Sequence, residues 1–289
     1  MFNLAALEAS SETGLATGLD TGLGGTIFAG KLHFVQITNS TNIDALEAAR
    51  SGAPHGSVYF ADEQLAGRGR GDHAWHSAAG QGLYVSVLLR PQFPAVRLPL
   101  LPLAAGLAAA DAIRGVAGLT VDLRWPNDLL IATPQTKTCL WGPRFGPRKV
   151  GGILVEARTE ARTDGGTVAV VGIGINVHQR GFVPGLTTPA TSLDLEAGRR
   201  ISRQALLVCL LKSLERETLG LLDPAAHETI PQRLEQASTW VRGRRVEVHG
   251  PQACTGETAG LDENGFLLVR TDTGLVTVQT GGIRAVEKS

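Results

Sequence analysis

Short segments in which apolar and polar residues alternate predict the strands of this chain, because successive side chains of a strand point to opposite faces. The clearest is "LYVSVLLRP", whose two faces carry different residues: Val85, Val87 and Leu89 against Tyr84, Ser86 and Leu88. Residues 31–37 and "GSVYFADEQ" are predicted strands as well, and "VDLRWPNDLLIA" predicts strand, turn and strand. "KVGGILVEAR" and "TVAVVGIGINV" are apolar on both faces, which is typical of paired strands at the centre of a sheet.

Apolar residues at helical spacing predict four helices between and after these strands. The first is expected to start at a capping Asn42 and to stop at Gly52. A second is expected over about 103–114. The third follows a capping Ser202 and closes at Asp223-Pro224, and the fourth lies within 224–237. We expect these helices to cover the sheet.

From Trp240 onward the chain consists of short predicted strands separated by "DENG" and "TDTG" turns, a pattern typical of a small β-barrel. Residues 1–30 are rich in Gly, Ser and Thr and show little periodicity, so we expect a poorly ordered or loosely docked extension there. The predicted fold class is α+β, with helices on a mixed central β-sheet and an all-β appendage. The predicted division is 1–30, 31–237 and 238–289.

The net charge and the cysteine content argue against several classes of protein. The 289 residues carry 27 basic and 27 acidic side chains, so a bulk electrostatic grip on nucleic acid or on an anionic membrane is not expected. The three cysteines are odd in number and far apart, which fits neither a disulfide framework nor a C-x-x-C metal site. The start of the chain lacks the basic residues of a secretory signal. We predict a soluble cytoplasmic enzyme.

Two segments carry side chains suited to binding an anion. "AGRGRGDHAW" (66–75) places two arginines among glycines, which predicts either an anion cradle or an ordinary solvated turn. "KVGGILVE" (149–156) places Lys149 before two glycines and a buried strand, and the lysine is either a solvated strand end or a point charge for a carboxylate or phosphate. "GIGIN" lacks the third glycine and the helix of a dinucleotide motif. Taken alone, the first two segments are compatible with an anion-binding site and equally with an ordinary solvated turn or strand end.

Six motifs in this order resemble the biotin protein ligase family. The matching segments are "TNSTN", "QLAGRGRGDHAW", "LYVS", "RWPND", "KVGGILVE" and "GIGIN", followed by the small all-β appendage. The resemblance covers about residues 31–289 and is closest to the family type without an N-terminal DNA-binding domain. It implies a catalytic domain of the class II synthetase-like biotin/lipoate ligase fold and an SH3-like C-terminal barrel.

The resemblance implies an ATP-dependent, AMP-forming ligase that acts in two steps. Biotin and MgATP give biotinyl-5′-AMP and pyrophosphate, and a lysine of a biotin carboxyl carrier protein then takes the biotinyl group. The expected cofactors are ATP and Mg²⁺, with no metal site made by protein side chains alone. The expected partner is the carrier protein of a biotin-dependent carboxylase, without DNA or membrane, and the sequence leaves open whether the chain forms a homodimer.

The resemblance also assigns site residues. Lys149 and Arg68 are the expected catalytic residues, Lys149 as the bridge between the biotin carboxylate and the α-phosphate. The expected biotin site is Ser40, Thr41, Asn42, Gln64, Gly67, Arg68, Gly69, Arg70, Tyr84, Lys149 and Gly152. The expected nucleotide site is Arg70, Trp75, Asn127, Asp128, Asn176 and Arg284, with Trp75 stacked on adenine and Asp128 either orienting Lys149 or meeting Mg²⁺.

Several departures and alternatives stay open beside this assignment. Asp72 and His73 stand where the family has Gly and Arg, and Lys137 is a rival for the catalytic lysine that lacks the following "GGILVE". A lipoate or octanoate ligase shares the fold, but its R-R-x-S-G-G-G-x-V segment is absent. A biotin-responsive repressor would need an N-terminal helix-turn-helix, and the segment before Thr38 does not show two capped amphipathic helices. A nucleic-acid module built on the Gly/Arg loop would bind in a strongly salt-dependent way.

Overall fold

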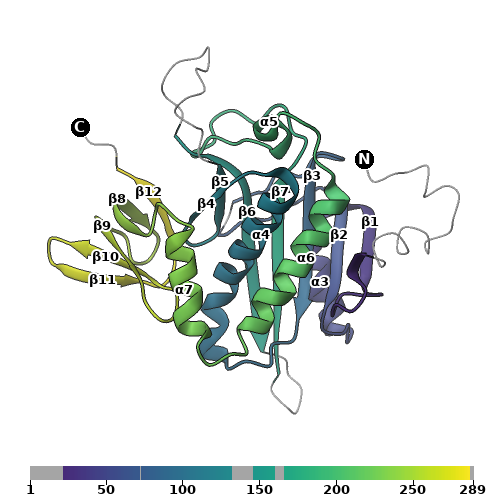
Figure 1. Ribbon diagram of the computed structural model, residues 1–289, viewed down its shortest axis with the longest axis horizontal. Coiled ribbons are helices and arrows are strands. Elements are labelled where there is room, and N and C mark those ends of the chain that lie inside the picture. The colour runs from purple at the N-terminus through teal and green to yellow at the C-terminus, as the bar shows by residue number, and fades with distance from the viewer. Residues whose placement is uncertain (1–21, 72, 132–145, 160–165, 287–289) are drawn as a thin grey trace, which may run out of the picture.

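A seven-stranded mixed sheet forms the body of the protein in a computed structural model that describes residues 22–71, 73–131, 146–159 and 166–286. The strand order is β1-β2-β3-β7-β6-β5-β4 (Figure 1). β1 and β2 are parallel and the other neighbours are antiparallel, which confirms the predicted mixed sheet. The strands are β1 (Leu32–Thr38), β2 (Ser57–Gln64), β3 (Gly82–Leu89), β4 (Val121–Arg124), β5 (Asp128–Ile131), β6 (Arg148–Thr159) and β7 (Thr167–Asn176).

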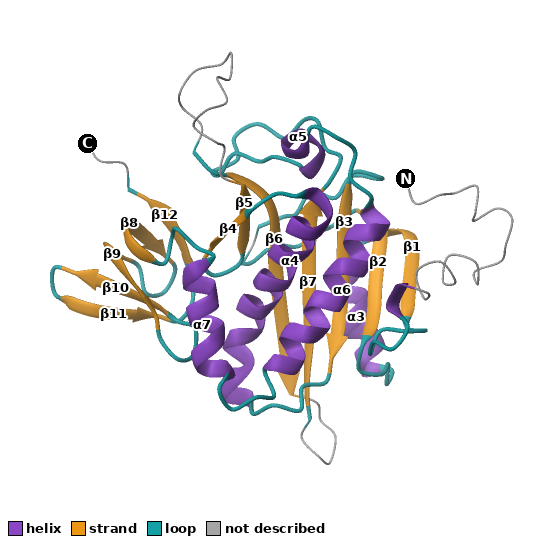
Figure 2. Cartoon of the chain, viewed as in Figure 1, coloured by secondary structure: helices purple, strands orange, loops and turns teal. Residues whose placement is uncertain are grey.

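Helices cover the two faces of this sheet unequally. α4 and α6 lie side by side on one face with α7 beside α4, whereas α3 covers the other face behind β2, β3 and β7 (Figure 2). The helical elements are α3 (Thr41–Arg50), the 3-10 turn η1 (Ala95–Leu100), α4 (Leu101–Ala117), α5 (Leu193–Ala197), α6 (Arg203–Gly220) and α7 (Ala226–Gln236). The sheet therefore has a broad apolar face under α4 and α6 and a second face that α3 covers only in part.

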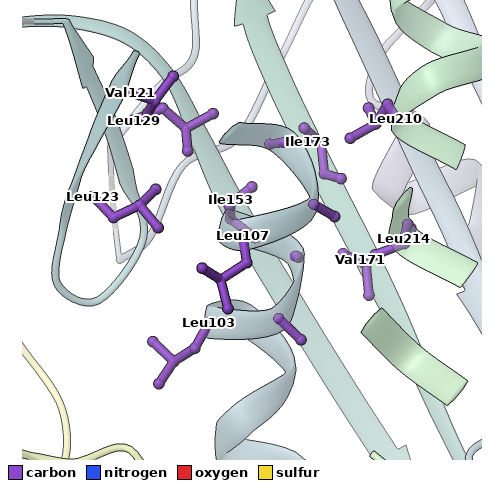
Figure 3. Packing of buried hydrophobic residues seen from close by; sticks show 14 of the residues in the cluster. Leu103, Leu107, Val121, Leu123, Leu129, Ile153, Val171, Ile173, Leu210 and Leu214 are labelled. Atoms are coloured by element: carbon purple, nitrogen blue, oxygen red, sulfur yellow. The ribbon is translucent and has the colours of Figure 1, made fainter. Parts of the chain in front are cut away.

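The alternation in β3 sorts its side chains between these faces as predicted. Val85, Val87 and Leu89 join the large core on the α4 and α6 face. On that face Leu107 of α4 lies beside Ile153 of β6, and Val171 of β7 lies toward α6 (Figure 3). Leu88 packs under α3 with Leu46 and Ala49, and Ser86 of the same row is left as a buried polar group. The polar side chains of the α3 face are thus set apart from the main core.

The C-terminal strands form a separate five-stranded antiparallel sheet, which confirms the predicted all-β appendage. Its strands are β8 (Arg242–His249), β9 (Cys254–Leu261), β10 (Leu267–Thr271), β11 (Gly274–Val278) and β12 (Gly282–Ala285), in the order β11-β10-β9-β8-β12. The sheet lies beyond α7 and the β4 edge (Figure 1). Its buried residues continue the main core, and Trp125 donates its indole N–H to the carbonyl of Gly265 at 3.0 Å.

Two expectations about the N-terminal part are wrong. Residues 22–30 are firmly packed, since Leu23 and Phe28 are fully buried in the main core; residues 1–21 lie outside the described residues. A segment with only two buried apolar side chains shows no period, so its docking left no pattern in the sequence. Helix α3 has Ser40, rather than Asn42, as its N-cap residue, and the Asn42 side chain faces the sheet.

The most apolar helix belongs to the core. The segment Ala95–Ala117 is long and apolar enough to cross a membrane, but 61% of its best window is buried within the fold. Its α-helical part, α4, extends past the expected 103–114 at both ends and stops at Gly118, whose φ of 71° is in the left-handed region that favours glycine. The predicted third helix is confirmed as α6, and Ser202 caps it by accepting a hydrogen bond from the Ala205 N–H.

A charged cluster on α4 and α6 yields a stability prediction. A hydrogen bond from Arg216, with further bonds from Arg114 and Ser213, lowers the pKa of Asp111 from 3.8 to about 2, against the opposing effect of burial. The ionised carboxylate therefore stabilises the fold above pH 3.8, and this contribution disappears as the pH falls toward 2. Because both arginines are largely exposed, we expect Asp111→Asn to lower the free energy of unfolding by only about 1 kcal/mol at pH 7.

Urea unfolding of both proteins between pH 7 and pH 3 measures this difference. The gap between wild type and Asp111→Asn should shrink as the pH approaches 3. Asp272→Asn, in an exposed turn, is the matched control and should not change the free energy of unfolding. A gap that stays constant over the whole pH range would contradict the assignment.

Candidate active site

Three glycines leave part of the α3 face of strands β6 and β7 without side chains. Gly152 and Gly174 are direct partners across the two strands, and Gly172 lies two residues before Gly174. A Cβ at Gly174 would lie 2.5 Å from the indole nitrogen of Trp75, and one at Gly172 would lie 2.2 Å from the Asn42 side-chain oxygen. We call Gly152, Gly172 and Gly174 the glycine floor. It lets two polar or aromatic side chains lie directly on the sheet.

A lysine and an arginine share one carboxylate at the end of this floor. Lys149 Nζ lies 2.6 Å from Asp128 Oδ1, and Arg124 donates to Asp128 Oδ2 through Nη2 at 2.5 Å and Nε at 3.0 Å. Lys149 stands at the start of β6, next to Gly152, and its Nζ lies 5.4 Å from the centre of the Trp75 ring. Asp128 is mostly buried between the two cations. Both of its oxygens are therefore occupied by protein donors.

The charge balance of this cluster favours an anionic ligand. Burial alone would raise the pKa of Asp128, but Lys149 and Arg124 outweigh it and hold the pKa below its ordinary value of 3.8. The carboxylate is therefore ionised near neutral pH and balances one of the two cations, so the cluster keeps one net positive charge. A carboxylate or phosphate that reached Lys149 would neutralise that charge.

The turn between β4 and β5 fixes Asp128 in this place. The Trp125-Pro126 peptide bond in the turn is cis, and Asn127 joins the turn to β6 in both directions. The Asn127 carbonyl accepts from the Ile153 N–H, and its side-chain amide donates to the Ile153 carbonyl, each at 2.9 Å. The sequence assigned Asn127 to the nucleotide, and its amide group is used here to hold the turn.

The described parts of the Gly/Arg loop, residues 67–71 and 73–75, pair with each other as the two arms of a small hairpin beside the floor. Gly69 N–H donates to the His73 carbonyl at 2.7 Å, and Trp75 N–H donates to the Gly67 carbonyl at 2.8 Å. A Cβ at Gly67 would lie 2.3 Å from the Trp75 carbonyl oxygen, so the hairpin needs glycine there. His73 is exposed, and Asp72 lies outside the described residues, as does Lys137.

The two arginines of this loop reach in different directions. Arg68 pairs with Glu156 of β6: Nη2 lies 3.3 Å from Oε1, and Nη1 donates to Oε2 at 3.3 Å. Arg70 donates to the Gly281 carbonyl at 2.8 Å and to the Thr280 hydroxyl at 3.0 Å, both in the turn between β11 and β12. Burial lowers the pKa of Arg70 below its ordinary value against the opposing effect of Asp128, and the guanidinium stays charged. Arg70 therefore ties the loop to the C-terminal sheet.

Polar side chains at the start of α3 form a continuous network with β2, β3 and β6. Gln64 accepts from the Thr41 N–H at 2.9 Å and donates to Ser77 at 2.7 Å. The Thr41 and Ser86 hydroxyls lie 2.7 Å apart, and Ser86 donates to the Asn42 side-chain oxygen at 2.6 Å. The Asn42 amide in turn donates to Glu156. The network brings together Thr41, Asn42 and Gln64, which the sequence placed around one ligand.

The other predicted site residues lie nearby with partners of their own. Ser40 is buried at the N-cap of α3 and makes no side-chain capping bond. The Tyr84 hydroxyl donates to the Ala78 carbonyl, and burial raises its pKa. The Asn176 amide donates to the Thr191 carbonyl and its oxygen accepts from Gln179. Arg284 is exposed on β12, three residues after the Gly281 carbonyl that Arg70 contacts.

Sequence reasoning gave no role to several residues that organise the site. Glu156 was quoted in its motif without a role, and Ser86 was treated only as one face of a strand. The isolated hydroxyl inside the apolar run "LYVSVLL" was the available signal for Ser86. Arg124 had no role beyond its place in "RWPND", and no sequence pattern pointed to Thr280 or Trp240. Trp240 is buried with the guanidiniums of Arg124 and Arg244 at 5.1 and 3.8 Å from its ring centre.

Known proteins resemble this chain over nearly its whole length. Residues 34–176 match the biotin/lipoate A/B protein ligase family, and residues 242–283 match the biotin protein ligase C-terminal domain. The bifunctional ligase/repressor BirA of Bacillus subtilis is 32% identical over 281 residues, covering 94% of this chain and 78% of that protein. The Mycobacterium tuberculosis biotin–[acetyl-CoA-carboxylase] ligase is 32% identical over 260 residues, which is 88% of each chain.

A solved structure with bound ligands resembles it as well. The biotin protein ligase from Aquifex aeolicus, in complex with biotin and ATP, superposes with a TM-score of 0.72 at 27% identity. The match covers 90% of this chain and all of that chain.

The contact between Arg70 and the C-terminal turn yields a prediction for the ligand-free protein. Arg70→Gln removes the charged donor that reaches Gly281 and Thr280, so the amides of residues 279–282 should exchange with solvent roughly fivefold faster. Hydrogen exchange followed by mass spectrometry measures this. Arg68→Gln is the matched control, because Arg68 pairs with Glu156 of the main sheet. Equal exchange of this turn in the two variants would show that Arg70 does not hold it.

Proposed function

The chain belongs to the biotin protein ligase family, and we propose that it converts biotin and ATP to biotinyl-5′-AMP and pyrophosphate and transfers the biotinyl group to a lysine of a biotin carboxyl carrier protein. The observation that carries the proposal is the placement of Lys149. Its ammonium lies 2.6 Å from Asp128, beside the glycine floor and Trp75. The two family matches and the biotin and ATP ligands of the Aquifex aeolicus relative support the choice of substrates.

In the first step, a carboxylate oxygen of biotin would bond to the α-phosphorus of ATP, and pyrophosphate would leave. Two anionic groups must approach each other, so the site has to supply fixed positive charge where negative charge builds up. We assign this role to Lys149, donating to the biotin carboxylate and to an α-phosphate oxygen. Asp128 would hold the ammonium in place, since its contact with Lys149 fixes the direction of the side chain. Arg68 would add a second cation from the loop.

The remaining predicted site residues keep their assignment in this proposal. The proposed biotin site is Ser40, Thr41, Asn42, Gln64, Gly67, Arg68, Gly69, Arg70, Tyr84, Lys149 and Gly152. The proposed nucleotide site is Arg70, Trp75, Asn127, Asp128, Asn176 and Arg284. Trp75 supports this division, because one side of its ring rests on Gly174 while the side chain stays partly exposed and can stack on a base.

Mg²⁺ would enter with the nucleotide in this proposal. Among the described residues there is no group of three His, Cys, Asp or Glu side chains placed to hold a metal ion. Asp128 is already engaged by two cations, so it fits the role of orienting Lys149 better than that of a metal ligand. Mg²⁺ commonly binds through substrate phosphates with few protein ligands, which suits this donor set.

In the second step, the amine of the carrier lysine would attack the biotinyl carbonyl carbon, and AMP would leave. The carrier of acetyl-CoA carboxylase fits the proposal, because the Mycobacterium tuberculosis relative is named for that enzyme. A nucleic-acid or membrane partner is not part of the proposal, given the balanced charge of the chain. We place the protein in the cytoplasm because its three cysteines are odd in number and far apart, and Cys209 and Cys254 are free thiols.

A homodimer formed along β1 is also part of the proposal. β1 is the outer strand of the main sheet and pairs only with β2 among the described strands. Val35 and Ile37 on this strand are 41% and 54% exposed, which is unusual for large apolar side chains on a free edge. A second copy that paired there would cover the edge and both side chains.

Biotin-dependent exchange between ATP and labelled pyrophosphate tests the proposal directly. We expect exchange with biotin in the wild type and a loss of at least about hundredfold in Lys149→Ala, because the main fixed cation is removed. Lys137→Ala is the matched control and should keep the wild-type rate, since Lys137 lacks the strand motif that follows Lys149. Exchange that responds to lipoate and not to biotin would instead assign the chain to the lipoate branch of the fold.

A further inference from the structure

Glu156 is an acidic residue that contacts both the Gly/Arg loop and the start of α3. It lies near the middle of β6, four residues after Gly152, and its side chain is only 18% exposed. It receives Arg68 from the loop and Asn42 from α3. Two segments far apart in the sequence therefore converge on a single carboxylate.

The charge of Glu156 sets the orientation of the Asn42 side chain. A carboxylate accepts hydrogen bonds and donates none, so the Asn42 NH₂ group must face it, and it does so at 2.9 Å. The Asn42 oxygen then points at Ser86, whose hydroxyl donates to it at 2.6 Å. A Cβ at Gly172 would lie 2.2 Å from this oxygen, so the amide group can take this position only because residue 172 is glycine.

The orientation of Asn42 also decides which of the Ser86 and Thr41 hydroxyls can donate to the other. Ser86 has one proton, and that proton is used on Asn42, so Thr41 is the donor in the 2.7 Å contact between the two hydroxyls. The Gln64 side-chain oxygen accepts from the Thr41 N–H at 2.9 Å and also lies 3.1 Å from the Thr41 hydroxyl, so the one hydroxyl proton of Thr41 faces both Ser86 and Gln64. The Glu156 carboxylate therefore orders Asn42 and Ser86, and leaves Thr41 as the only possible donor between the two hydroxyls.

The same carboxylate holds Arg68. The arginine side chain is 45% exposed, and Glu156 is the charged group that contacts it at 3.3 Å. The backbone of the loop on either side is held by bonds within the hairpin, Gly69 to His73 and Trp75 to Gly67. Glu156 is thus the link between the Arg68 end of this hairpin and the floor of the site.

We propose that Glu156 is a positioning residue, which holds Arg68 and the Asn42–Ser86–Thr41 chain in the arrangement that receives biotin. The part that concerns biotin rests on the proposed function. Glu156 acts through Arg68 and Asn42, and no contact between Glu156 and a ligand is required. Glu156→Gln keeps the shape of the side chain but removes its charge, so the pairing with Arg68 weakens and the orientation of Asn42 is no longer enforced.

The first test uses the ligand-free protein and is independent of its activity. Hydrogen exchange of the Gly69 and Trp75 amides should become roughly fivefold faster in Glu156→Gln and in Arg68→Gln, and the double variant should not exceed either one. Glu47→Gln, on the exposed side of α3, is the matched control and should exchange as the wild type does. Unchanged exchange in Glu156→Gln would overturn the proposal.

The second test measures biotin-dependent exchange of ATP with pyrophosphate in the same proteins. We expect the KM for biotin to rise about tenfold in Glu156→Gln, with the KM for ATP and the melting temperature near wild-type values. The effects of Arg68→Gln and Glu156→Gln on that KM should overlap in the double variant. A lower melting temperature with fully additive effects would make Glu156 a structural residue only and overturn the proposal. A wild type inactive with biotin would overturn the proposed function, while the hydrogen-exchange result would still decide whether Glu156 holds Arg68.

Discussion

The arrangement of the site depends on one carboxylate that two cations share. Asp128 can meet Lys149 only because the turn before it is bonded to Ile153 of β6 through Asn127. The Arg124 side of the same carboxylate rests on Trp240, at the start of the C-terminal part, and Trp125 of the turn donates to Gly265 between β9 and β10. The lysine, the turn and the C-terminal sheet therefore form one connected structure. A displacement of the C-terminal sheet would therefore change the position of Asp128 and, with it, that of the Lys149 ammonium.

The second constraint is the group of three glycines on the α3 face of β6 and β7. The α4 and α6 face of these strands is filled by Ile153, Val171 and their neighbours (Figure 3), whereas the opposite face has glycine at 152, 172 and 174. Asn42 and Trp75 lie against these glycines, so the network of α3 and the Gly/Arg loop sit close to the sheet backbone. The polar network and the positive charge of Lys149 are thus brought to the same face of one sheet.

The sequence predicted most of the fold and part of the site. Alternation in β3 and the apolar runs of β6 and β7 predicted the central strands correctly, because burial on one or both faces determines those residues directly. The docking of Leu23 and Phe28 was not predicted, since it depends on contacts with distant residues. The same holds for Arg70, whose partners lie more than 200 residues away in the chain. Motif resemblance brought Lys149 and Asp128 together, but the roles of Glu156 and Ser86 needed the register of β3, β6 and β7.

The central claim is that Asp128 fixes Lys149 as the cation that meets the reacting anions, and single-turnover formation of biotinyl-5′-AMP by Asp128→Asn tests it most directly. The substitution keeps the size of the side chain and removes the shared negative charge, so Lys149 loses its orientation and repels Arg124. Our account predicts that adenylate formation slows by on the order of a hundredfold while the protein remains folded by circular dichroism. Adenylate formation at the wild-type rate in folded Asp128→Asn would contradict it.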